Sequence, residues 1–217
     1  MSNHILIWAG GPEYLFPPAK VMVQLKKEVD IWIGADRGAL HLLDWGLTPC
    51  LSIGDFDSVS EDEYEYIEKG SQRVENHPAE KNETDLEIAI SEALKRNVTQ
   101  LTLVGVTGGR MDHQMMTMQL MEKIAMKGIV VDLYEQSGRV WIWPPGVYEL
   151  RESHSAYVSF LPVSDRVDGL SLNGFKYDTN DVCLYHASSL CISNKQTKTV
   201  AEVSFHKGLL YGVTASE

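Results

Sequence analysis

Two patterns of hydrophobic and polar residues divide the chain near residue 136. Before that point, short apolar runs alternate with amphipathic stretches such as 86–94, where apolar residues recur at helical spacing. The runs expected to form strands are 5–9, 30–35, 51–53, 72–75, 101–106 and 129–134. Strands that alternate with helices in this way predict an open, mostly parallel sheet with helices on both faces.

After residue 136 the helical periodicity ends and short β-rich runs follow one another. The expected strands are 140–143, 156–161, 182–185, 190–192, 200–205 and 209–213. Turn signals such as Asp168-Gly169 and Asn173-Gly174 separate them. This pattern of short strands separated by turns predicts an antiparallel sandwich or small barrel. The predicted fold class is therefore α/β, with a parallel-sheet domain at residues 1–136 and an antiparallel β-sandwich domain at 137–217.

Composition and charge narrow the range of partners. The 217 residues include 19 Lys and Arg against 30 Asp and Glu, a net charge of −11, which argues against a nucleic-acid-binding surface. Cys50, Cys183 and Cys191 form no C-x-x-C pair, which favours a reduced compartment. No apolar segment has the length of a signal peptide core or a membrane span. We expect a cytoplasmic protein with no nucleic-acid partner and no membrane partner.

Acidic residues follow several of the predicted strands directly. Asp36, Asp55 with Asp57, and Asp112 each come after an apolar strand, and Asp85 opens a helix on the same side. In an extended chain Asp55 and Asp57 would point to one side, about 6–7 Å apart, and could share one or two hydrated Mg²⁺ ions. Carboxylates about 4 Å apart repel by roughly 1 kcal/mol even in water. The edge of the sheet where these aspartates gather, called the acidic rim below, is therefore expected to hold cations. For each Asp alone, capping of the following helix stays an alternative.

Glycine-rich turns and basic residues lie near the same strand ends. Gly10-Gly11 follows the first predicted strand, and Gly108-Gly109-Arg110 follows the fifth. The backbone N–H groups of such turns can approach phosphate, and a guanidinium suits bidentate phosphate contact. A plain tight turn explains Gly10-Gly11 at least as well, and a surface turn with an incidental Arg stays the alternative for Gly108-Gly109-Arg110. Lys81 lies in a polar loop, where a solvated side chain is the default. Thr84 and Glu87 form a capping box that by itself explains a helix start.

Four motifs in this order resemble the bacterial thiamine pyrophosphokinases: G-A-D-R-G-A at 34–39, S-I-G-D-F-D-S at 52–58, K-N-E-T-D-L-E at 81–87 and G-G-R-M-D-H at 108–113. I-S-N at 192–194 and V-S-F-H-K-G-L-L at 203–210 are similar to that family's C-terminal thiamine-binding domain. The resemblance implies transfer of a pyrophosphoryl group from ATP to the thiamine hydroxyl, giving thiamine diphosphate and AMP. It also implies a homodimer that binds thiamine between the α/β domain of one subunit and the β-domain of the other.

The resemblance further implies roles for individual residues. The residues that would hold Mg²⁺ and the triphosphate are Asp55, Asp57 and Asp85. The acidic rim would be completed by Asp36 and by Asp112, with Asp112 in reach of the substrate hydroxyl. Phosphate contacts would come from Arg110 and Lys81, and the remaining nucleotide-binding positions would be Gly10, Gly11, Thr84, Gly108 and Gly109. Ser193 and Asn194 would lie at the thiamine site.

Three positions depart from the family's pattern and leave the details of the thiamine pocket open. The family often has Asn where this chain has Thr117, Gly where it has Cys191, and an acidic residue where it has Lys195. Other functions also stay open. A related pyrophosphokinase could act on another alcohol such as a pterin. A D-x-D phosphatase or phosphotransferase would use Asp55 as nucleophile and Asp57 as acid. A thiamine- or nucleotide-sensing module would have no activity.

Overall fold

The structure is a computed structural model that describes residues 3–78, 80, 82–151 and 157–215. The described chain divides into two compact units. Unit 1 consists of residues 1–120 and 133–136, and unit 2 of residues 121–132 and 137–217. Helix α5 (Met111–Ala125) and strand β6 (Val130–Glu135) therefore contribute to both units. The predicted domain boundary between residues 136 and 137 stays a prediction.

Unit 1 is built on a parallel sheet formed by the predicted apolar runs. Its strands are β1 (His4–Trp8), β2 (Ile31–Ala35), β3 (Leu51–Gly54), β4 (Val74–Asn76) and β5 (Gln100–Val104). They lie in the order β4-β3-β2-β1-β5, and each neighbouring pair is parallel. All five residues of β1 are buried, as expected for a central strand covered on both faces. The predicted mostly parallel sheet is confirmed.

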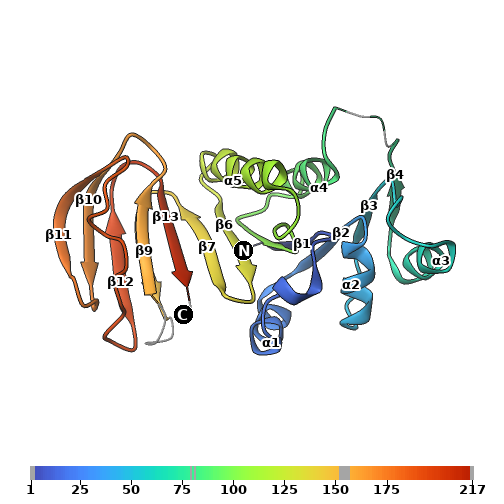
Figure 1. The fold of residues 1–217 in the computed structure, drawn as a ribbon, viewed down its shortest axis with the longest axis horizontal. Helices are drawn as coiled ribbons and strands as arrows, with labels where there is room; N and C mark the ends of the chain where they lie inside the picture. The colour runs from blue at the N-terminus through green and yellow to red at the C-terminus, as the bar shows by residue number, and fades with distance from the viewer. Residues whose placement is uncertain (1–2, 79, 81, 152–156, 216–217) are drawn as a thin grey trace. The chain divides into compact units, whose positions relative to one another are not determined.

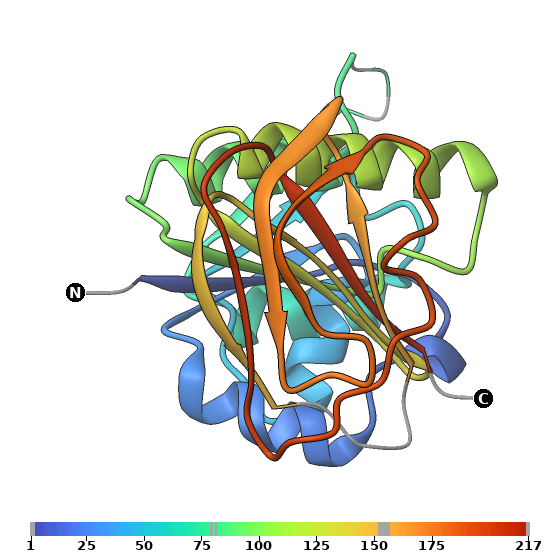
Figure 2. The same cartoon turned by 90° about the vertical axis from the view of Figure 1, so that its left-hand side faces the viewer.

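Helices cover both faces of this sheet. They are α1 (Ala19–Glu28), α2 (Gly38–Asp44), α3 (Glu61–Gly70), α4 (Asp85–Leu94) and α5, with a short 3₁₀ helix at Glu13–Leu15. In Figure 1 and Figure 2, α1 lies on one side of the strands and α5 on the other. Met22 and Leu25 of α1 share a buried cluster with Leu6 and Trp8 of β1. The apolar face of each helix thus explains its place against the sheet.

Unit 2 contains two layers of antiparallel strands around one apolar core. The first layer consists of β7 (Gly138–Trp143), β13 (Leu210–Ala215) and β9 (Tyr157–Pro162), and the second is a four-stranded sheet of β11 (Thr179–Tyr185), β10 (Arg166–Asn173), β12 (Ala201–Phe205) and β8 (Gly146–Leu150). Trp141 and Phe160 from the first layer and Leu170 and Val203 from the second belong to the same buried cluster. The predicted β-sandwich is confirmed.

Three details of unit 2 differ from the sequence-based expectation. Strands β8 and β10 were not predicted, because turn-forming residues begin the one and interrupt the other. Asp168-Gly169 lies inside β10, where Gly169 has φ 76° and the pairing with β11 shifts register between Val167 and Leu170. The strand predicted at 190–192 is wrong, because these residues form a turn.

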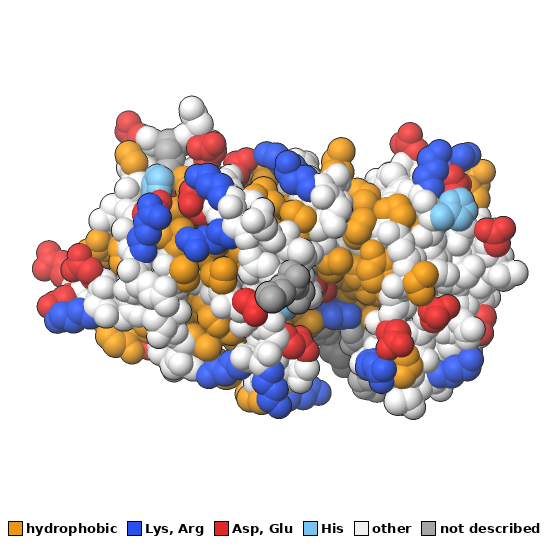
Figure 3. Space-filling model, turned by 180° about the vertical axis from the view of Figure 1, so that it is seen from behind, with side chains coloured by type: hydrophobic (Ala, Val, Ile, Leu, Met, Phe, Trp, Pro, Cys, Tyr) orange, Lys and Arg blue, Asp and Glu red, His pale blue; other side chains and the backbone are white. Residues whose placement is uncertain are grey.

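The surface carries charges of both signs. On the face drawn in Figure 3, basic and acidic side chains are interspersed with apolar ones, despite the net charge of −11. None of the described helices is both long enough and apolar enough to cross a membrane.

Candidate active site

A pocket of about 430 Å³ lies in unit 1 beyond the carboxyl ends of β1, β2 and β5. Its lining includes Ala9–Gly11 after β1, Asp36 after β2, Gly105–Thr107 after β5, Thr84–Leu86 at the start of α4, and residues of α5. The strand order reverses between β1 and β5, because β2, β3 and β4 all lie on one side of β1 and β5 on the other. In open α/β sheets, ligands bind at such a switch point, beyond the carboxyl ends of the strands.

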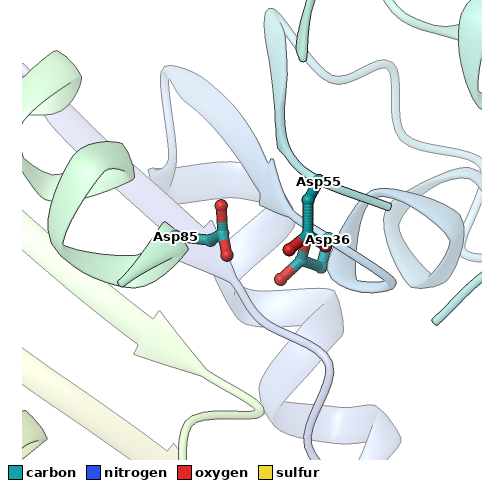
Figure 4. Close-up of side chains that lie close together, drawn as sticks. All are labelled: Asp36, Asp55 and Asp85. Atoms are coloured by element: carbon teal, nitrogen blue, oxygen red, sulfur yellow. The ribbon is translucent and has the colours of Figure 1, made fainter. Parts of the chain in front are cut away.

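Three carboxylates meet at this end of the sheet. Asp36, Asp55 and Asp85 each place an oxygen within 4.8 Å of the others, and all three are half-buried. Figure 4 shows Asp36 and Asp55 side by side and Asp85 facing them from the start of α4. Mg²⁺ takes carboxylate oxygens and keeps several waters, so this donor set fits a hydrated divalent cation. A cation would also relieve the repulsion between the three negative charges.

The segment that carries Asp55 and Asp57 differs from the extended chain that we expected. Strand β3 ends at Gly54, and Phe56 has φ 56°, so the two carboxylates do not follow the alternation of a strand. The side chain of Phe56 is buried and packs edge-on against Tyr64, with ring centroids 5.3 Å apart. Asp57 is exposed, and its N–H donates to Asp55 Oδ1 at 3.1 Å. Among the described residues, the three-carboxylate group therefore contains Asp36 rather than Asp57.

Gly54 is a residue of this site to which the sequence reasoning gave no role. A Cβ atom at this position would lie 1.9 Å from Asp36 Oδ1 and 3.2 Å from Asp36 Cα. Only glycine leaves room for the Asp36 carboxylate at its present position. The motif S-I-G-D-F-D-S contained this glycine, but a close contact with β2 is not visible in a linear pattern.

Arg110 and Asp112 form an exposed ion pair at the start of α5. Arg110 Nε donates to Asp112 Oδ1 at 3.1 Å, and Nη2 donates to Oδ2 at 2.5 Å. These hydrogen bonds lower the pKa of the Asp112 carboxyl, which makes it a weaker proton acceptor while the pair is intact. Arg110 lines the pocket, whereas the three-carboxylate group, as far as the chain is described, does not include Asp112. On the same helix, Thr117 lines the pocket and donates to the His113 carbonyl at 2.9 Å.

The predicted glycine turns lie at the pocket but differ in what they offer. The Gly11 N–H donates to Gly105 O at 2.8 Å, so this donor joins the loops after β1 and β5. A Cβ at Gly11 would lie 2.5 Å from that carbonyl oxygen, which explains the need for glycine. Gly10 and Gly109 line the same pocket, and Gly108 lines a neighbouring hollow of about 470 Å³.

Two further predicted residues flank the start of α4. The Thr84 hydroxyl accepts a hydrogen bond from Glu87 N at 3.2 Å, which confirms Thr84 as the N-cap of α4. This cap places Asp85 at the first helical position, inside the lining of the pocket. Lys81, the predicted phosphate contact, lies outside the described residues.

Ser193 and Asn194 belong to unit 2. The Asn194 side chain is buried; its Oδ1 accepts from Tyr177 N at 3.0 Å and from Lys195 N at 2.9 Å, and its Nδ2 donates to Tyr177 O at 2.8 Å. The amide therefore holds two backbone segments together, while Ser193 is exposed with φ 57°. Their predicted place at the thiamine site stays a prediction.

Comparison with known proteins covers nearly the whole chain. A family model described as "Thiamin pyrophosphokinase, catalytic domain" matches residues 22–133, and one described as "Thiamin pyrophosphokinase, vitamin B1 binding domain" matches residues 147–210. The thiamine pyrophosphokinase of Bacillus subtilis (strain 168) is 36% identical over 214 residues, which are 98% of this chain and 99% of that protein.

Solved structures of thiamine pyrophosphokinases have the same fold. The B. subtilis structure has a TM-score of 0.86 and 34% identity, and the match covers 99% of this chain and all of that one. The Geobacillus thermodenitrificans structure has a TM-score of 0.80 and 32% identity, and the match covers 99% of this chain and 98% of that one. The two domain matches and the full-length identity lead to one conclusion: the chain belongs to the thiamin pyrophosphokinase family.

Proposed function

We propose that this enzyme transfers a pyrophosphoryl group from ATP to the hydroxyl group of thiamine at the pocket beyond β1, β2 and β5, and that it requires Mg²⁺. The products are thiamine diphosphate and AMP. Family membership supports the reaction. The observation that carries its assignment to this pocket is the meeting of Asp36, Asp55 and Asp85 within 4.8 Å at the switch point of the sheet. The donor set is suited to a divalent cation and therefore to a bound triphosphate.

In this proposal Asp36, Asp55 and Asp85 hold Mg²⁺, and when bound the ion would neutralise charge on the triphosphate. The three aspartates come from the ends of two strands and the start of one helix, so the sheet and α4 fix their positions together. Asp57, assigned to the metal from the sequence, is kept as a candidate ligand because its side chain is exposed and its backbone N–H donates to Asp55 Oδ1. Its role is tested separately by mutation.

Arg110 is proposed to contact the phosphates and Asp112 to accept the proton of the substrate alcohol. Phosphoryl chemistry depends mainly on positioning and charge neutralisation, for which a guanidinium at the pocket is suited. Because Arg110 lowers the pKa of the Asp112 carboxyl, the pair has to separate before Asp112 becomes an effective base. Hydrogen bonds from Arg110 to the phosphate oxygens of the substrate would break the ion pair and free Asp112.

The remaining parts of the proposal concern thiamine, assembly and location. Ser193 and Asn194 are assigned to the thiamine site, and the active unit is a homodimer with its site at the subunit interface. Met111 and Met115 support an interface in unit 1, because they are 70% and 60% exposed and line the neighbouring hollow. All three cysteines are free thiols, which supports a cytoplasmic location. Light scattering on the purified protein tests the dimer.

Product analysis tests the reaction. The protein is incubated with ATP, Mg²⁺ and thiamine, and the products are identified by mass. Thiamine diphosphate together with AMP is the expected result, and a chelator should abolish it until Mg²⁺ is restored. Free phosphate without a thiamine product would instead indicate a phosphatase. A product formed only when a pterin alcohol replaces thiamine would show that thiamine is not the substrate. Binding without turnover would indicate a sensing module.

A further inference from the structure

Arg37 follows Asp36 in the chain, and the reaction proposed above gives it no role. Its guanidinium makes three hydrogen bonds to the segment after β3. Nη1 donates to Ser58 O at 3.0 Å and to Glu63 Oε2 at 3.2 Å, and Nη2 donates to Glu63 Oε1 at 2.8 Å. Among the described residues that line the pocket, Arg37 does not appear. Its contacts therefore point to the loop that carries Asp55 rather than to a substrate.

Asp36, the residue before Arg37, contacts the other end of the loop that carries Asp55 and Asp57. Asp36 N donates to Ile53 O at 2.9 Å, and Asp36 Oδ1 accepts from Phe56 N at 3.4 Å. Phe56 has φ 56°, a conformation that a bulky residue keeps only where its surroundings impose it. Two consecutive residues at the end of β2 thus fix the loop on both sides of Asp55 and Asp57.

Glu63 connects this loop to the start of α3. Its Oε2 accepts from Ser60 N at 2.9 Å, and Ser60 Oγ accepts from Glu63 N at 3.3 Å, so the two residues form a complete capping box. The hydrogen bond from the Ser60 backbone, followed by those from Arg37, lowers the pKa of the Glu63 carboxyl. Glu63 therefore stays ionised at neutral pH and remains a two-oxygen acceptor for the guanidinium.

We propose that Arg37 is a positioning residue that sets the place of the Asp55 carboxylate beside Asp36 and thereby the affinity of the three-carboxylate group for a divalent cation. This inference rests on the proposed metal role of that group. The planar guanidinium is essential to it, because one side chain reaches both Glu63 oxygens and the Ser58 carbonyl at once. A lysine keeps the charge but cannot make these contacts together.

The test measures binding of Mn²⁺ alone, as the probe, by electron paramagnetic resonance of the free ion in the absence of nucleotide. The variants are Arg37→Met and Arg37→Lys, with Lys69→Met as the matched control. Lys69 also pairs with a glutamate on α3, Glu65 at 2.5 Å, but this pair lies one turn apart within the helix itself. Thermal unfolding and the dependence of turnover on Mg²⁺ and on thiamine are measured on the same proteins.

Both Arg37 variants should bind Mn²⁺ about 10–100-fold more weakly than wild type, the range typical for residues that orient metal ligands. The Mg²⁺ concentration for half-maximal turnover should rise by a similar factor, whereas the KM for thiamine stays unchanged. Lys69→Met should match wild type in every binding measurement. Circular dichroism at the assay temperature should show all the variants folded, so that weaker binding does not reflect unfolded protein.

Unchanged Mn²⁺ affinity in Arg37→Met would overturn the inference. It would also be overturned if the loss of Mn²⁺ binding equalled the fraction of unfolded protein measured by circular dichroism. Wild-type affinity in Arg37→Lys would show that charge suffices and would refute the geometric argument. A wild-type protein that binds no Mn²⁺ would refute the metal proposal itself, which distinguishes that failure from a failure of the role of Arg37.

Discussion

The contact between Gly54 and Asp36 gives the sharpest test of the site's geometry. A Cβ at residue 54 would lie 1.9 Å from Asp36 Oδ1 and 2.8 Å from its Cγ, well inside van der Waals contact. In Gly54→Ala the Asp36 carboxylate has to leave its present position in the three-carboxylate group, because the new methyl group overlaps its Oδ1 and Cγ atoms. The substitution therefore removes one of three carboxylates from the group without changing any charge.

The magnitude follows from the size of the clash. Overpacking a close contact costs typically about 1–3 kcal/mol of unfolding free energy. For a chain of this length, 217 residues, each kcal/mol lowers the melting temperature by about 2–4 °C. Displacement of a positioned group by about 1 Å can lower turnover by about 100-fold. We therefore expect a modest loss of stability and a large loss of activity.

A double-mutant cycle with Asp36→Gly assigns the effect to this one contact. Glycine suits the φ of 50° at residue 36 and removes both atoms that clash most closely with the new methyl group. In the Asp36→Gly background, Gly54→Ala should lose at least half of its stability cost, measured by urea unfolding monitored by circular dichroism. Additive costs would refute the reasoning, because residues in direct contact should couple. Normal turnover of Gly54→Ala would refute the role of the Asp36 carboxylate.

The remaining predictions concern charge, pH and a buried amide. Asp55→Asn and Asp57→Asn should each abolish turnover with an unchanged melting temperature, and near-normal turnover in Asp57→Asn would remove Asp57 from the metal site. Burial lowers the pKa of His41 from 6.5, so below about that pH the unfolded chain binds the proton more readily and folding stability falls. The melting temperature of wild type should therefore drop more than that of His41→Phe between about pH 7 and about pH 5; parallel curves would contradict this. Asn194→Ala should cost at least about 2 kcal/mol in urea unfolding, because buried backbone groups lose their partners, and a cost near zero would be inconsistent with the hydrogen bonds described.

Local patterns in the sequence determined the fold class and most of the elements. Strand and helix periods, helix caps and turn residues depend on neighbouring positions, so the parallel sheet of unit 1 and the N-cap at Thr84 could be predicted. The same local reasoning failed at β10, where Asp168-Gly169 lies at a shift of register inside the strand rather than in a turn. A bulge and a turn use the same residues, and only the pairing partner distinguishes them.

Tertiary structure decided which of the acidic residues meet. The sequence placed several aspartates at strand ends, but the group within 4.8 Å combines Asp36, Asp55 and Asp85, which are far apart in the chain. Phe56 is buried with a φ of 56°, so Asp55 and Asp57 do not alternate as they would in a strand, and Gly54 and Arg37 make their contacts across neighbouring strand ends. Sequence patterns record which residues are adjacent along the chain, whereas a cation site requires oxygens adjacent in space, and only the packing of sheet and helices establishes that.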